Sequence, residues 1–110
     1  MAFTERQKKV VGLMDGLGFR ESQAGTADIR RAVDLMMERP GGLMHKDIYP
    51  ALAGADRQAI ARVERRIRGA ITTAMQSPNW DEAWRDLGGW GKPTNSELVR
   101  RLAREAANED

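Results

Sequence analysis

The sequence predicts an all-α protein with about six helices packed in one compact bundle, and two observations support this fold class. First, apolar residues recur at spacings of three and four along the chain, and no stretch of strand length alternates with β-branched residues. Second, three segments that begin at Thr4, Asn79 and Thr94 carry the sequence of a helix start, with an Asn or Thr followed three residues later by Glu or Gln.

The first half of the chain predicts three helices. The first follows the Thr4 signature and is expected to end at Gly16 and Gly18. A second is expected from about Thr26 to Glu38, and a third, short one near His45 to Ala53. The third contains Pro50, which lacks a backbone donor and must therefore lie in the first turn or kink the helix.

The second half predicts three more helices. Residues 54–56 form a tight turn whose Asp56 can cap a long helix running to about Gln76. The Asn79 signature opens a short helix that ends at Gly88 and Gly89, and the Thr94 signature opens the last helix, through about Ala106.

Length and composition predict a single domain. The chain has 110 residues, of which 41% are hydrophobic and 31% charged, within the globular range. We expect residues 1–107 to form this domain and residues 108–110 to be a frayed tail. Without cysteine, the chain can form neither a disulfide nor a thiolate zinc site, which is compatible with a cytoplasmic protein. No apolar run approaches the roughly 18 residues of a membrane span, so no membrane partner is expected.

Positive charge is concentrated in the long helix predicted over about residues 56–76. The net charge is only +2, but five arginines lie between Arg57 and Arg68 against the single acid Glu64. On a helical wheel, the apolar stripe of this helix consists of Ile60, Val63, Ile67, Ile71 and Ala74. The opposite face consists of Gln58, Arg62, Arg65 and Gly69, flanked on one side by Arg57, Glu64 and Arg68, while Arg66 points elsewhere.

A short helix, a tight turn and a longer helix with arginines in its N-terminal half are typical of a helix-turn-helix, whose second helix enters the major groove of DNA. Arginine matches guanine O6 and N7, and glutamate can accept from cytosine N4. The alternative is a solvated helix face, in which Glu64 and Arg68 form an ion pair one turn apart. Periodicity alone leaves both interpretations open.

Two longer motifs favour the first interpretation. Tyr49-Pro50 is followed, twelve residues further on, by Arg62-Val63-Glu64-Arg65 with Ile67-Arg68 and Ala70-Ile71. Near the end of the chain stands Lys92-Pro93-Thr94-Asn95-Ser96-Glu97. With these motifs, residues 15–106 resemble the effector domain of the stage 0 sporulation protein A family of bacterial response regulators.

The resemblance implies an all-helical transcription-factor domain that binds boxes of the type TGNCGAA in double-stranded DNA. It implies that the base-reading residues are Arg62, Glu64, Arg65 and Arg68. Phosphate contacts are expected from Lys46, Lys92, His45 and Gln58. We expect the chain to be a monomer in solution and a homodimer on tandem boxes, in a cytoplasmic, nucleoid-associated setting without a cofactor.

The chain departs from the family pattern at several places. No receiver domain fits in 110 residues, so a receiver-containing relative is a possible partner. The connection before Lys92 is shorter than in relatives, Arg66 replaces a small residue, and residues 57–61 replace a helix start rich in Thr and Ser. The rival function is an interaction protein that pairs with a full-length regulator and titrates it, with weak or no DNA binding.

Other residue clusters predict no chemistry. His45 and Asp47 supply too few ligands for a transition metal. No Ser-His-Asp set or phosphate-binding loop is present, so an enzyme is not expected. Core packing is favoured over base stacking for Trp80, Trp84 and Trp90.

Overall fold

The computed structural model describes residues 4–108 and confirms the all-α prediction, since this part of the chain contains no β-strand. Its helices are α1 (Glu5–Leu17), α2 (Ala24–Glu38), α3 (Tyr49–Ala53), α4 (Arg57–Ala74), α5 (Trp80–Asp86) and α6 (Asn95–Ala107). A π-helical turn, η1 (Met44–Ile48), leads directly into α3. None of these helices combines the length and the apolarity that crossing a membrane requires. Residues 109 and 110 of the expected frayed tail lie outside the described residues.

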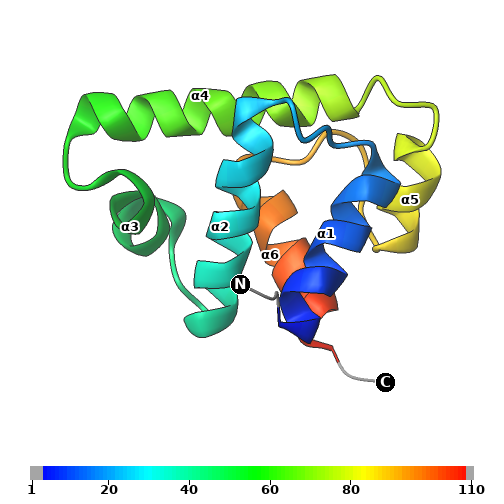
Figure 1. Cartoon of the computed structure of the whole chain (residues 1–110), viewed down its shortest axis with the longest axis horizontal. Helices are drawn as coiled ribbons and strands as arrows, with labels where there is room; N and C mark the ends of the chain where they lie inside the picture. The colour runs from blue at the N-terminus through cyan, green and yellow to red at the C-terminus, as the bar shows by residue number, and fades with distance from the viewer. Residues whose placement is uncertain (1–3, 109–110) are drawn as a thin grey trace.

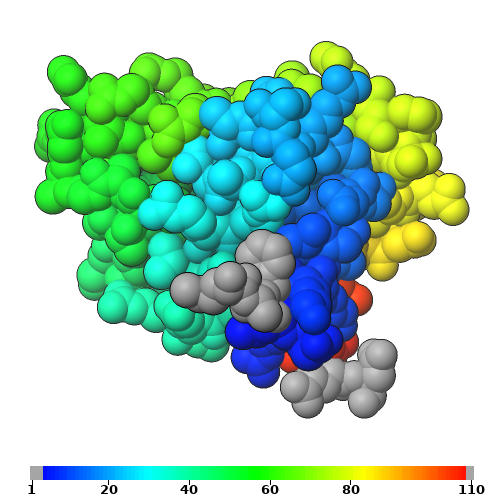
Figure 2. All heavy atoms as spheres, viewed as in Figure 1, coloured from blue at the N-terminus to red at the C-terminus, as the bar shows by residue number. Residues whose placement is uncertain are grey.

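The long helix α4 lies along one side of the molecule, and α1, α2 and α6 run away from it (Figure 1). The short helices α3 and α5 lie near its two ends (Figure 1). On the face drawn in Figure 2, α1 and α2 cover the middle of the molecule. At the far side from α4, the Nζ of Lys9 in α1 donates to the backbone oxygen of Asn108, 2.9 Å away, which joins the first helix to the last.

The core is one cluster of buried side chains to which every helix contributes. Helices α2 and α4 pack closely because Gly25 lies against the backbone of α4, where a Cβ would collide with the carbonyl oxygen of Arg66. Ile67 and Ile29 are fully buried on the two sides of this crossing. The backbone of α4 is therefore held directly against the core.

Three predicted caps are confirmed and one is wrong. Thr4 and Thr94 form complete capping boxes, and the Asp56 side chain accepts from the backbone N–H of Gln58 at 3.2 Å. The side chain of Asn79 makes no capping hydrogen bond, because its backbone is already helical (φ −89°, ψ −10°). The backbone N–H of Asn79 instead donates to the Ser77 hydroxyl.

Several helix ends differ from the prediction. Gly16 lies inside α1, and Gly18 alone ends it, with a left-handed φ of 101°. Helix α2 begins at Ala24, earlier than expected, and α4 ends at Ala74, before Gln76. Pro50 lies in the first turn of α3, one of the two positions expected for it.

The tryptophans divide into two groups. Trp80 and Trp84 are buried, as predicted, and their rings are stacked with centroids 5.7 Å apart. The prediction that Trp90 packs in the core is wrong, since 84% of its surface is exposed. At Gly89, where a Cβ would collide with the Trp84 indole, the backbone already covers that ring, and the chain leaves the core before Trp90.

Candidate nucleic-acid interface

Helix α3, the turn of residues 54–56 and α4 have the order and proportions of a helix-turn-helix. Gly54 ends α3 with a φ of 77°, a conformation that residues with a Cβ rarely adopt. Asp56 then starts α4 two residues later. Because α3 packs against α4, this turn fixes the direction in which α4 leaves it.

The two faces of α4 differ as the wheel predicts. Its core stripe is buried at Val63, Ile67, Ile71 and Ala74, while Ile60 is half-buried at the edge. Three predicted base-reading residues, Arg62, Arg65 and Arg68, are exposed. The exposed arc of α4 is therefore basic and stands on a backbone that the core holds in place.

The fourth predicted base-reading residue, Glu64, lies at the margin of this arc, and its side chain is only 29% exposed. Its Oε2 is 3.5 Å from Nε2 of His45, which η1 contributes. The His45 ring stands edge-on to the Tyr49 ring, with centroids 5.1 Å apart. Among the residues that the structure describes, the basic side chain closest to the Glu64 carboxylate is therefore His45, and not Arg68 as the solvated-face interpretation expected.

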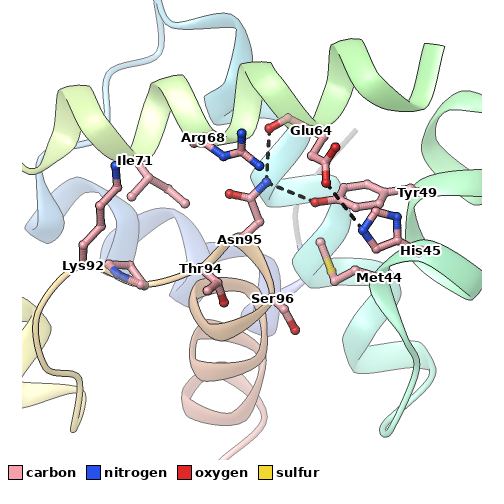
Figure 3. Close-up of a pocket in the computed structure, with 11 residues that line it drawn as sticks. Met44, His45, Tyr49, Glu64, Arg68, Ile71, Lys92, Thr94, Asn95 and Ser96 are labelled. Atoms are coloured by element: carbon pink, nitrogen blue, oxygen red, sulfur yellow. Dashed lines mark hydrogen bonds and ion pairs between the residues drawn. The ribbon is translucent and has the colours of Figure 1, made fainter. Parts of the chain in front are cut away.

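Four of the predicted site residues line one cavity of about 430 Å³ between η1, α4 and the start of α6, namely His45, Glu64, Arg68 and Lys92. Met44 and Ile71 contribute apolar lining, and Thr94 and Ser96 contribute hydroxyl groups. Figure 3 shows Lys92 beside Ile71 at one end of the cavity and His45 at the other. The structure thus brings together residues that are widely separated in the sequence.

Asn95 is a site residue to which the sequence assigned no role. Its Nδ2 donates to the Tyr49 hydroxyl and to the backbone oxygen of Glu64, at 3.1 Å each (Figure 3). One amide thus connects α3, α4 and α6 beside Glu64. The sequence feature that could have indicated a role for Asn95 is its place in the Lys92–Glu97 motif, but a motif does not reveal which groups an amide contacts.

Burial raises the pKa of the Tyr49 hydroxyl, and the nearby Glu64 carboxylate adds to the rise, against the hydrogen bond from Asn95. The folded chain therefore holds the phenolic proton of Tyr49 more tightly than an exposed tyrosine does.

The other predicted site residues lie outside the cavity. Lys46 is exposed on η1, and Gln58 is exposed in the first turn of α4. Arg66 leaves the basic arc and points to α2, as its position on the wheel predicts. No group of three or more metal-ligating side chains occurs in residues 4–108.

A comparison with protein families matches residues 10–106 to the family described as "Sporulation initiation factor Spo0A C terminal". The chain belongs to this family. The matched segment includes η1, α3, α4 and the Lys92–Glu97 segment that lines the cavity, so it contains every predicted site residue.

The Spo0A C-terminal family consists of DNA-binding effector domains and is not a family of enzymes. The resemblance found in the sequence is therefore confirmed, and with it a role as a DNA-binding domain of transcription regulation that acts on double-stranded DNA. In this Spo0A C-terminal domain, the helix with the greatest concentration of exposed arginine is α4.

Proposed function

We propose that α4 is the recognition helix of this Spo0A C-terminal domain and reads a TGNCGAA-like box in the major groove. The observation that supports this most strongly is the face of α4 opposite its buried stripe, on which Arg62, Arg65 and Arg68 are all exposed. A helix held by its buried stripe can present such a face to base edges without rearranging the fold.

The base-reading chemistry is divided between two kinds of side chain. The guanidinium groups of Arg62, Arg65 and Arg68 suit the O6 and N7 acceptors of guanine. The carboxylate of Glu64 suits the N4 amino group of cytosine, and it can be reached because it lies at the margin of the exposed arc. The box offers both bases, since each G·C pair presents guanine acceptors and a cytosine donor in the major groove.

Phosphate contacts come from residues around this arc. Lys46 and His45 are exposed on η1, Gln58 is exposed at the start of α4, and Lys92 lies at the far end of the cavity. Contacts of this kind fix the position of the domain on the duplex and make its affinity depend on salt.

Selective binding in a genome requires more sequence than a single helix reads. Two copies therefore bind side by side on tandem boxes, and the free chain is a monomer. A receiver-containing relative is a further candidate partner.

The second candidate function is pairing with a full-length regulator, which the domain would titrate without strong DNA binding of its own. The exposed Trp90 indole favours this candidate, because large exposed aromatic side chains are common in protein interfaces. Pairing with a regulator does not, however, explain why the exposed face of α4 is basic.

An electrophoretic mobility shift experiment at one fixed salt concentration distinguishes the two candidates. The DNA-reading function predicts that a TGNCGAA duplex is bound more tightly than a scrambled duplex of the same length and composition. The preference should be lost in Arg65→Ala and kept in a Trp90→Ala control. Equal affinity for the two duplexes in the wild-type chain would contradict the proposal and favour pairing with a regulator.

A further inference from the structure

We propose that His45 is a positioning residue for Glu64 and determines how strongly the domain discriminates at the base pair that Glu64 reads. This inference rests on the proposed function, because it assumes that α4 reads bases. The relationship behind it is the 3.5 Å approach of the His45 Nε2 to the Glu64 Oε2 across the gap between η1 and α4.

The backbone at Glu64 is fixed, but its carboxylate has only one side-chain partner in the part of the chain that the structure describes. Asn95 donates to the backbone oxygen of Glu64, so residue 64 is tied to α6. Beyond that point, the long Glu side chain has several rotatable bonds, and holding it in one place costs conformational entropy. At its end, the carboxylate is approached by the His45 imidazole.

The His45 ring is itself positioned by packing. It stands edge-on to the ring of Tyr49, with an interplanar angle of 72°, and Tyr49 is buried and accepts from Asn95. The imidazole remains 73% exposed, but one side of its ring rests on Tyr49 while its Nε2 faces Glu64 (Figure 3).

The pair leaves the carboxylate able to read a base. His45 approaches Oε2, and 29% of the Glu64 side chain remains exposed. The second carboxylate oxygen can then accept from a cytosine amino group, while the imidazole lies beside the first. Supporting contacts of this kind raise the precision of a side chain that contacts a ligand.

The test is a double-mutant cycle on His45 and Glu64, in which the measured quantity is the ratio of the affinities for the cognate and the substituted duplex. The base pair read by Glu64 is first located as the position of the box at which Glu64→Ala abolishes the preference for the cognate pair. At that position, His45→Ala should lower the ratio of cognate to substituted affinity about fivefold, a coupling of the size measured between contacting side chains. In the Glu64→Ala background, His45→Ala should not change the ratio.

Two control variants separate positioning from a phosphate contact. His45→Gln places an amide donor near the position of Nε2 and should restore most of the ratio. Lys46→Ala removes a neighbouring cation on η1 and should weaken cognate and substituted duplexes alike. An unchanged ratio in His45→Ala, or the same loss with and without Glu64, would overturn the proposal.

A measurement without DNA tests the contact itself. The chain has a single histidine, so the NMR resonances of its imidazole are unambiguous. Glu64→Gln should shift the Nε2 resonance at constant pH, because Nε2 then faces an uncharged amide. An unshifted resonance would overturn the positioning role.

Failure of the inference can be told apart from failure of the proposed function. If Glu64→Ala changes no base preference while Arg65→Ala does, the inference and the base-reading role of Glu64 are overturned, and the proposed recognition role of α4 stands. If the wild-type chain prefers no box, both are overturned.

Discussion

The guanidinium of Arg66 forms a two-point hydrogen-bonded ion pair with the carboxylate of Asp28. Its Nε donates to Oδ2 at 2.7 Å and its Nη2 to Oδ1 at 3.4 Å, which joins α4 to α2. The Asp28 side chain is only 9% exposed, and its hydrogen bond is the main cause that raises the pKa of Arg66. The neighbouring Arg65 is exposed to solvent, so two adjacent arginines of α4 lie in different surroundings.

Arg66→Ala should destabilise the fold. The substitution leaves the nearly buried Asp28 carboxylate without its partner, which costs about 1 to 3 kcal/mol. We place the loss below that of a fully buried pair because 43% of the Arg66 side chain is exposed. Chemical denaturation followed by circular dichroism measures it, and Asp28→Asn with Arg66→Ala should cost less than Arg66→Ala alone. An unchanged unfolding midpoint in Arg66→Ala would show that the pair contributes nothing.

Arg65→Ala and Lys46→Ala should affect DNA binding in different ways. Loss of a base contact at Arg65 should cost about 1 to 3 kcal/mol on the box and little on a scrambled duplex. Loss of a phosphate contact at Lys46 should weaken binding to both duplexes. It should also reduce the slope of log affinity against log salt concentration by about one. Titrations at several salt concentrations measure both effects. If either variant matched the wild type on both duplexes, its assigned contact would be wrong.

Trp84→Ala and Trp90→Ala form a matched pair for stability. Truncating the buried Trp84 removes the partner of the Trp80 ring and leaves a cavity, at a cost of about 3 to 5 kcal/mol. Truncating the exposed Trp90 should change the free energy of unfolding by less than about 0.5 kcal/mol. Thermal melting of the two variants tests the contrast, and a large loss in Trp90→Ala would mean that the indole packs on the domain.

Stability should fall as the pH rises above about 10. Burial raises the pKa of Tyr49 above its ordinary value of 10.0, so the folded state binds the phenolic proton more tightly than the unfolded state does. The stabilisation is complete below the pKa of the unfolded chain and is lost as the pH rises through the folded pKa. Because Tyr49 is the only tyrosine, ultraviolet absorbance follows its ionisation directly. Ionisation at the same pH in native and denatured protein would contradict this.

The chain should be monomeric in solution and dimeric on DNA that carries two adjacent boxes. Each copy contributes one recognition helix, and contact between neighbouring copies then supplies cooperativity. Sedimentation velocity on the free protein and on one-box and two-box duplexes gives the stoichiometry. A stable dimer without DNA, or equal affinity per site on the two duplexes, would refute the arrangement.

The sequence by itself determined the helices and the faces of α4. The capping boxes at Thr4 and Thr94 lie within a few residues of sequence, and so does the period that buries Ile67 and exposes Arg65. Such interactions are local, so their geometry follows from the order of the residues. One local prediction was wrong, because the backbone of Asn79 is helical and its side chain makes no capping hydrogen bond.

Only the tertiary structure decided the partners of the site. The sequence placed Glu64 on α4, but its contact with His45 depends on how η1 approaches α4. The same is true of Asn95, whose one amide reaches both Tyr49 and the backbone of Glu64. The exposure of Trp90 was also decided in three dimensions, because the backbone at Gly89 already occupies the space over the neighbouring core ring. Contacts between distant segments depend on the packing of whole helices, which no local pattern encodes.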